Sequence, residues 1–139
     1  MLRVSFDLLA EKGARPRFET RDAEVGELMR GPWIGVDAHG RFCAGSGEVV
    51  ADVPYGKWIH VEMSCALGGV GNGYDLKLSL SGEAPLVDRR NLWMHSGFST
   101  LGWMGIISEA SGDERFYMDN FRLSASCAER MGDKEGKGK

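Results

Sequence analysis

The residues best suited to chemistry in this 139-residue chain are His60 and Glu62, which share the polar face of one predicted strand. A histidine titrates near neutral pH, and a carboxylate two positions away on a strand points to the same side. Glycoside hydrolysis, however, generally needs two carboxylates that flank the scissile bond, and no predicted strand carries such a pair two residues apart. The alternative is a surface histidine paired with Glu62 or, across the sheet, with Asp75. The sequence therefore selects no catalytic set.

Other common reaction centres lack their sequence patterns. No G-x-S-x-G elbow occurs, and the glycine run at 68–73 leads into a strand rather than a phosphate-binding helix N-terminus. The three cysteines, Cys43, Cys65 and Cys127, are too widely spaced for a zinc site. One disulfide among them is compatible with the sequence, and so are three reduced thiols with Cys65 buried as a small apolar residue.

Aromatic side chains suggest ligand binding, because sugar rings stack their C–H faces on tryptophan and tyrosine. Trp58 begins a strand on its polar face, and Trp93 lies in a segment that we expect to be a long loop. The alternative is that each tryptophan covers an edge of the core, and Trp33 and Trp103, in apolar strands, favour that interpretation. The candidate ligand-binding residues are Trp58, His60, Glu62, Asp75, Lys77, Arg90, Trp93 and His95.

Asp119 is the candidate metal ligand. It is separated by an even number of positions from the apolar residues Tyr117, Phe121 and Leu123, so in an unbroken strand its carboxylate would point to the same side, toward the core. A buried carboxylate needs a charge partner, hydrogen bonds or a metal. Asp119 with Asp7 and nearby carbonyl groups would make a calcium site, although no D-x-D-x-D loop is present. The alternative is a structural aspartate that accepts hydrogen bonds from the backbone N–H groups of a turn.

Period-two alternation predicts the strands that would position these residues. It is clearest over 2–8, 58–67, 74–81, 103–110 and 116–124. Shorter strands are expected near 15–21, 32–37, 41–45 and 48–53. A loop is expected over 22–32, and a long loop with room for one short strand over 86–100. Eight to ten short strands, many glycine turns and no convincing helix predict an all-β, antiparallel sandwich.

Composition limits the domain organisation and the partners. One β-sandwich domain is expected over residues 1–126, with a disordered polar tail over 127–139. A net charge of −3 argues against nucleic acid as the main partner. The arginines clustered at 15–21 and 89–90 are therefore expected to be solvated. No signal peptide and no apolar run of transmembrane length are present, and a start directly in a strand suggests a domain of a larger protein.

Two sequence motifs resemble a known superfamily. GKWIHVEMSCALG followed by YDLKLSL contains a G-x-W-x-H-V strand, which Gly56, Trp58, His60 and Val61 match. FSTLGWMGIISEA precedes FYMDNFRLS, whose closing pattern ends in Asp119 and Asn120 after Phe116 and Tyr117. Over residues 55–124 the chain resembles the concanavalin A-like lectin/glucanase superfamily, in particular laminin-G-like and pentraxin-like modules of bacterial, often carbohydrate-active, proteins.

The resemblance implies a jelly-roll sandwich that serves as a non-catalytic, carbohydrate-binding accessory module of a larger extracellular or periplasmic protein. The enzymes of the superfamily carry an E-x-D-x-x-E strand that has no counterpart here, so glucanase activity is not expected. Calcium sites in lectin-like relatives suggest Asp119 as a ligand. Two alternatives stay open: a structural or protein-interaction domain, and a lyase or hydrolase that uses His60 and Glu62. A concave, open polar face would favour the glycan-binding function.

Overall fold

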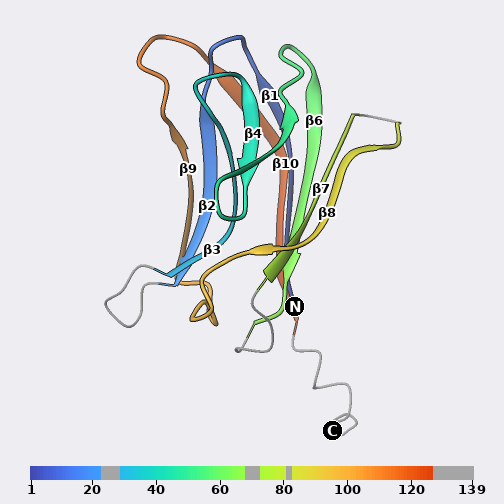
Figure 1. Ribbon diagram of the computed structural model, residues 1–139, viewed down its shortest axis with the longest axis vertical. Coiled ribbons are helices and arrows are strands. Elements are labelled where there is room, and N and C mark those ends of the chain that lie inside the picture. The colour runs from blue at the N-terminus through green and yellow to red at the C-terminus, as the bar shows by residue number, and fades with distance from the viewer. Residues whose placement is uncertain (23–28, 68–72, 81–82, 127–139) are drawn as a thin grey trace, which may run out of the picture.

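The structure is a computed structural model that describes residues 1–22, 29–67, 73–80 and 83–126 (Figure 1). The predicted tail over 127–139 and most of the glycine turn at 68–73 lie outside these residues. The described residues form ten strands and no helix, and therefore no helix long and apolar enough to span a membrane. The predicted all-β class is confirmed.

The ten strands build two antiparallel five-stranded sheets, which pack as a β-sandwich. Sheet A has the order β10-β1-β6-β7-β8 and consists of Phe116–Ala125, Leu2–Ala10, Trp58–Cys65, Gly73–Leu80 and Pro85–Trp93. Sheet B has the order β5-β4-β3-β2-β9 and consists of Glu48–Asp52, Arg41–Ala44, Met29–Val36, Pro16–Asp22 and Trp103–Ser108. The first and last strands are thus neighbours in sheet A.

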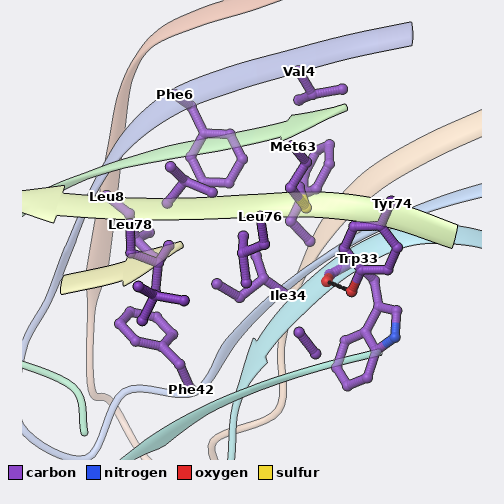
Figure 2. Packing of buried hydrophobic residues seen from close by; sticks show 14 of the residues in the cluster. Val4, Phe6, Leu8, Trp33, Ile34, Phe42, Met63, Tyr74, Leu76 and Leu78 are labelled. Carbon is purple, nitrogen blue, oxygen red and sulfur yellow. Dashed lines mark hydrogen bonds between the residues drawn. The ribbon is translucent and has the colours of Figure 1, made fainter. Parts of the chain in front are cut away.

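The core forms because the central strands alternate as predicted. In β1 and β6, and in β7 as far as Leu78, every second side chain is buried and the intervening ones reach solvent. Figure 2 shows Phe6, Leu76 and Leu78 of sheet A extending toward Ile34 and Phe42 of sheet B. Burial of these large apolar side chains is the main favourable term for joining the two sheets.

The sandwich is closed along one side, where β5 and β8 approach each other. The buried Tyr74 hydroxyl donates a hydrogen bond to the Trp33 carbonyl oxygen at 2.6 Å and accepts one from the Gly45 amide at 2.7 Å. Arg89 of β8 forms an ion pair with Glu48 of β5. These contacts tie sheet A to sheet B through polar groups as well as through the core.

The opposite side, between β9 and β10, is more open. Phe121 of β10 lies 6.4 Å from the buried Phe6 ring and 6.1 Å from Phe18, so it faces the core. Yet Phe121 is 39% exposed and Leu123 is 40% exposed. Among the described residues, each of β9 and β10 has a sheet neighbour on one side only and is therefore an edge strand.

Two loop predictions are only partly correct. The segment 86–100, predicted as a long loop with room for one short strand, begins with residues 86–93 in the nine-residue strand β8. Its alternation is hidden by a bulge at Arg90 and Asn91, where the register against β7 shifts and Asn91 has a φ of 59°. Residues 23–28 of the predicted loop over 22–32 lie outside the described residues, whereas Asp22 belongs to β2 and β3 already begins at Met29.

Candidate functional site

The outward face of sheet A carries two adjacent hollows, of about 730 Å³ and about 650 Å³. Both are formed by the polar side chains of β1, β6 and β7 together with their neighbours. The larger hollow is lined among others by Arg3, Ser5, Glu62, Ser64, Asp75, Lys77, Asp88, Arg90, Arg122 and Ser124. The smaller one is lined by Asp7, Trp58, His60, Ser79, Leu80, Glu83, Asp119 and Asn120. We call this surface the sheet A groove.

The most connected polar group in the sheet A groove is centred on Asp7. His60 Nδ1 lies 2.7 Å from Asp7 Oδ1, and Asn120 Nδ2 donates a hydrogen bond to Asp7 Oδ2 at 2.7 Å. On the other side of the imidazole, Nε2 lies 3.3 Å from Glu62 Oε2. The pairing register explains the contact, because β1 places Asp7 directly opposite His60. The predicted pairing of His60 with Glu62 is confirmed, whereas Asp7 takes the place suggested for Asp75.

Electrostatics keep the Asp7 carboxylate ionised. The Asn120 hydrogen bond, followed by the hydrogen bond with His60, lowers the pKa of Asp7 below its ordinary value of 3.8. Because the pKa is lower in the folded chain, this interaction stabilises the fold above that value and is lost as the pH falls through the folded pKa. At neutral pH the smaller hollow therefore presents a fixed, negatively charged acceptor.

Three further candidates line the larger hollow. Asp75, Lys77 and Arg90 come together from β7 and β8. Arg90 Nη1 lies 3.7 Å from Asp75 Oδ2, and Arg90 Nε donates to Asp88 Oδ1 at 3.3 Å. Since these side chains are largely exposed, the pairs add little stability and leave their donors and acceptors accessible to a ligand.

The tryptophan and histidine candidates divide between the groove and its surroundings. Trp58 is 43% exposed and lines the smaller hollow. Trp93 is 53% exposed at the end of β8 but lines neither hollow. His95 lies beyond β8, where its Nδ1 accepts a hydrogen bond from the Gly97 amide at 2.9 Å. Six of the eight predicted ligand-binding residues therefore line the groove, and Trp93 and His95 do not.

The predicted burial of Asp119 is wrong. A bulge in β10 places Asn120 and Phe121 opposite the single residue Phe6, and Asn120 adopts a φ of 53°. Because of the extra residue, side chains before and after the bulge no longer alternate in step. Phe121 therefore faces the core, while Asp119 pairs with Asp7 on the outward face and is exposed. Asp119 Oδ1 accepts a hydrogen bond from the Asn120 amide at 2.8 Å, within β10 itself rather than from the neighbouring turn that the structural alternative predicted.

The pairing of Asp7 with Asp119 brings the two predicted calcium ligands to one surface. Both Asp7 oxygens, however, already have hydrogen-bonding partners. Within the described residues no three His, Cys, Asp or Glu side chains converge as a metal site. Calcium binding at Asp7 and Asp119 stays a prediction, and the function proposed below does not depend on it.

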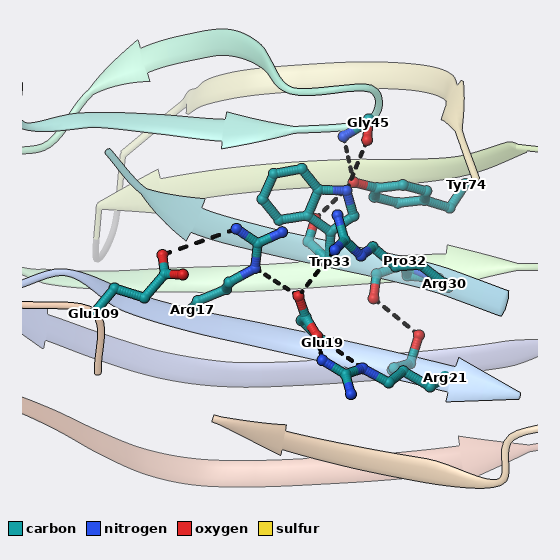
Figure 3. A network of polar contacts seen from close by, with 10 residues as sticks. Arg17, Glu19, Arg21, Arg30, Pro32, Trp33, Gly45, Tyr74 and Glu109 are labelled. Carbon is teal, nitrogen blue, oxygen red and sulfur yellow. Dashed lines mark hydrogen bonds and ion pairs between the residues drawn. The ribbon is translucent and has the colours of Figure 1, made fainter. Parts of the chain in front are cut away.

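A second polar cluster lies on sheet B (Figure 3). Glu19, only 2% exposed, lies 2.5 Å from Arg17 Nε, 2.5 Å from Arg21 Nη2 and 3.5 Å from Arg30 Nη2. Burial raises the pKa of Glu19, but hydrogen bonds from Arg21 and Arg17 outweigh that effect and hold it below its ordinary value of 4.5. The Arg17 guanidinium also lies 4.3 Å from the Trp33 ring centroid.

Sequence reasoning missed this cluster because it treated the arginines of 15–21 as solvated. The available signal was R-x-E-x-R within a predicted strand, since period two brings Arg17, Glu19 and Arg21 to one face. Arg89 is likewise paired, with Glu48. The arginine clusters are therefore largely engaged in ion pairs within the chain.

Comparison of the chain with protein-family models, curated proteins and solved structures finds no match.

Proposed function

We propose that this chain is a non-catalytic carbohydrate-binding module with a concanavalin A-like, jelly-roll sandwich, and that the sheet A groove is its binding surface. The observation that carries the proposal is the pair of adjacent hollows lined by hydrogen-bonding side chains and by the exposed Trp58 ring. An extended chain of sugar rings offers many hydroxyl groups to such a surface and an apolar ring face to a tryptophan. The motif resemblance over residues 55–124 supports the same function.

The charges of the groove favour a neutral glycan. Six carboxylates and four lysine or arginine side chains line the two hollows. The smaller hollow is lined by the carboxylates of Asp7, Glu83 and Asp119, and none of its lining residues is a lysine or arginine. A sulfated or uronate-rich polysaccharide would meet electrostatic repulsion there, whereas neutral hydroxyls pair with carboxylates and cations alike.

The test is a glycan-array screen of the full chain, followed by titration of the best ligand against the wild type and Trp58→Ala. We expect neutral polysaccharides to bind and Trp58→Ala to weaken binding by roughly tenfold, as expected for the loss of a central aromatic contact. Trp93→Ala is the matched control, because Trp93 is also exposed but lies outside the groove. Equal affinities for wild type and a folded Trp58→Ala variant would reject this binding site.

A second candidate function, glycan cleavage, has one observation in its favour. A carboxylate that orients a histidine, as Asp7 does for His60, is an arrangement used in acid–base catalysis. Against it, both ring nitrogens of His60 already face carboxylates. Incubation with each bound polysaccharide, with His60→Ala as the control, tests this candidate through the appearance of new chain ends.

A structural role without a glycan ligand would leave the array blank for a folded protein.

A further inference from the structure

We infer that the free edge of β10 pairs with β10 of a second copy of this chain, so that two sandwiches form a symmetric dimer. The inference starts from an exposed apolar surface on an edge strand. Phe121 and Leu123 face the core but are 39% and 40% exposed, because sheet B does not cover them fully. An unpaired strand edge next to such side chains is a template for pairing with another chain.

The β10 edge also carries two opposite charges suited to self-pairing. Asp119 and Arg122 both lie on the outward face and are both exposed. Neither has an ion-pair partner within the residues that the structure describes. They flank the Asn120–Phe121 bulge symmetrically, with one charge on each side of it.

A two-fold, antiparallel alignment centred on this bulge matches these features. When Asn120 lies opposite the partner's Phe121, Asp119 lies opposite the partner's Arg122, and the symmetry axis generates the same ion pair a second time. In the same alignment Met118 lies opposite the partner's Leu123, and both side chains face the core side. Charged residues therefore meet charged residues of opposite sign, and apolar residues meet apolar residues.

The backbone groups match in this alignment as well. Met1 and Ser126 donate backbone hydrogen bonds to each other. In an antiparallel ladder every second residue of a strand bonds to the same neighbouring strand, so the backbone N–H and C=O groups of Ser124 and Arg122 also point toward β1. The backbone groups of Leu123 therefore point to the free edge. On the other side of the bulge, the Glu11 amide donates a hydrogen bond to the carbonyl oxygen of residue 115, so residue 115 faces β1. By the same alternation, the backbone groups of Met118 point to the free edge. Met118 and the partner's Leu123 are thus an available hydrogen-bonded pair.

The bulge explains why the alignment is specific. A bulge on an edge strand normally disrupts pairing with a regular strand, which protects the edge from unrelated chains. Another β10 carries the same bulge, and the two-fold axis superimposes the two interruptions. Pairing in this way joins the two five-stranded sheets into one continuous sheet and places two sheet A grooves side by side. A polymeric glycan would then be bound by two sites at once.

The experiment measures the mass of the full chain in solution by sedimentation and light scattering over a range of concentrations. We expect a dimer for the wild type. Asp119→Arg and Arg122→Glu should each weaken dimerisation by roughly tenfold or more, because each places like charges opposite one another at two symmetric positions. An equimolar mixture of the two variants should restore a dimer. In the mixed pair the two substituted positions face each other with opposite charges, and the native Arg122 of one variant faces the native Asp119 of the other.

Arg3→Glu is the matched control, because Arg3 is an exposed arginine of the same outward face on the interior strand β1. It should leave the dimer intact. A wild type that stays monomeric at all concentrations, or a mixture that stays monomeric although both variants unfold cooperatively, would overturn the inference. If a variant does not fold, hydrogen exchange of the wild-type amides tests the dimer instead. The Met118 and Leu123 amides should exchange more slowly as the protein concentration rises, and exchange rates that do not change with concentration would also overturn the inference.

Discussion

Replacing Glu19 by glutamine should destabilise the chain strongly although the substitution changes almost no volume. The Glu19 carboxylate is buried on sheet B between Arg17, Arg21 and Arg30, with the nearest nitrogens at 2.5, 2.5 and 3.5 Å. Glutamine keeps one carbonyl oxygen as an acceptor but removes the charge. Its amide group would also direct N–H donors at guanidinium groups that have only donors themselves.

The magnitude follows from the burial of the partners. Breaking a fully buried ion pair by removing one member costs about 3–5 kcal/mol. Here the side chains of Arg17, Arg21 and Arg30 are 20%, 26% and 39% exposed, so they regain part of their hydration. We therefore expect Glu19→Gln to lower the free energy of unfolding by about 2–3 kcal/mol. For a domain of this size that corresponds to a fall in Tm of roughly 6–12 °C.

The assay is urea unfolding at a series of pH values, with Glu109→Gln as the control. Glu109 lies 3.8 Å from Arg17 but is 39% exposed, so its substitution should cost less than about 1 kcal/mol. Because the pKa of Glu19 is lowered on folding, its stabilisation is complete above the ordinary value of 4.5. The gap between wild type and Glu19→Gln should then narrow as the pH falls through the folded pKa. A Glu19→Gln variant as stable as Glu109→Gln at pH 7 would refute the electrostatic argument.

Three further predictions concern the core, the groove and the thiols. Tyr74→Phe should cost about 1–3 kcal/mol in urea unfolding, because it leaves a buried carbonyl oxygen and a buried amide without their hydroxyl partner. If Asp7 and Asp119 bind calcium, Tm should rise with calcium concentration, and Asp119→Asn should remove the rise; a constant Tm in the wild type would exclude the site. Burial raises the pKa of Cys65 to about 11 and also raises that of Cys43, to which the Asp37 charge contributes. Maleimide at pH 8 should therefore label Cys65 only after unfolding and Cys43 slowly, as followed by peptide mass spectrometry; rapid labelling of Cys65 in the folded chain would contradict this.

The central strands of the fold were predictable because each has one fully buried and one solvated face. In β6 the buried set is Ile59, Val61, Met63 and Cys65, and the polar set is the one that reaches the sheet A groove. The alternation therefore located His60 and Glu62 correctly. It could not identify Asp7 as the partner of His60, because register between β1 and β6 depends on the packing of both strands against sheet B.

The failures occur where one residue interrupts the alternation. Period-two alternation placed Asp119 in the core, and the lack of alternation over 86–93 favoured a loop. In both cases an asparagine with positive φ lies within the strand. Asparagine tolerates this conformation better than other residues with side chains, and a residue in it at a bulge shifts the parity of all that follows. An asparagine inside an otherwise alternating segment is thus a reason to consider a second pattern, in which the alternation shifts by one position at the asparagine. In β10 this shifted pattern places Asp119 outside and Phe121 inside. It also puts the charges of Asp119 and Arg122 on one face of a free edge.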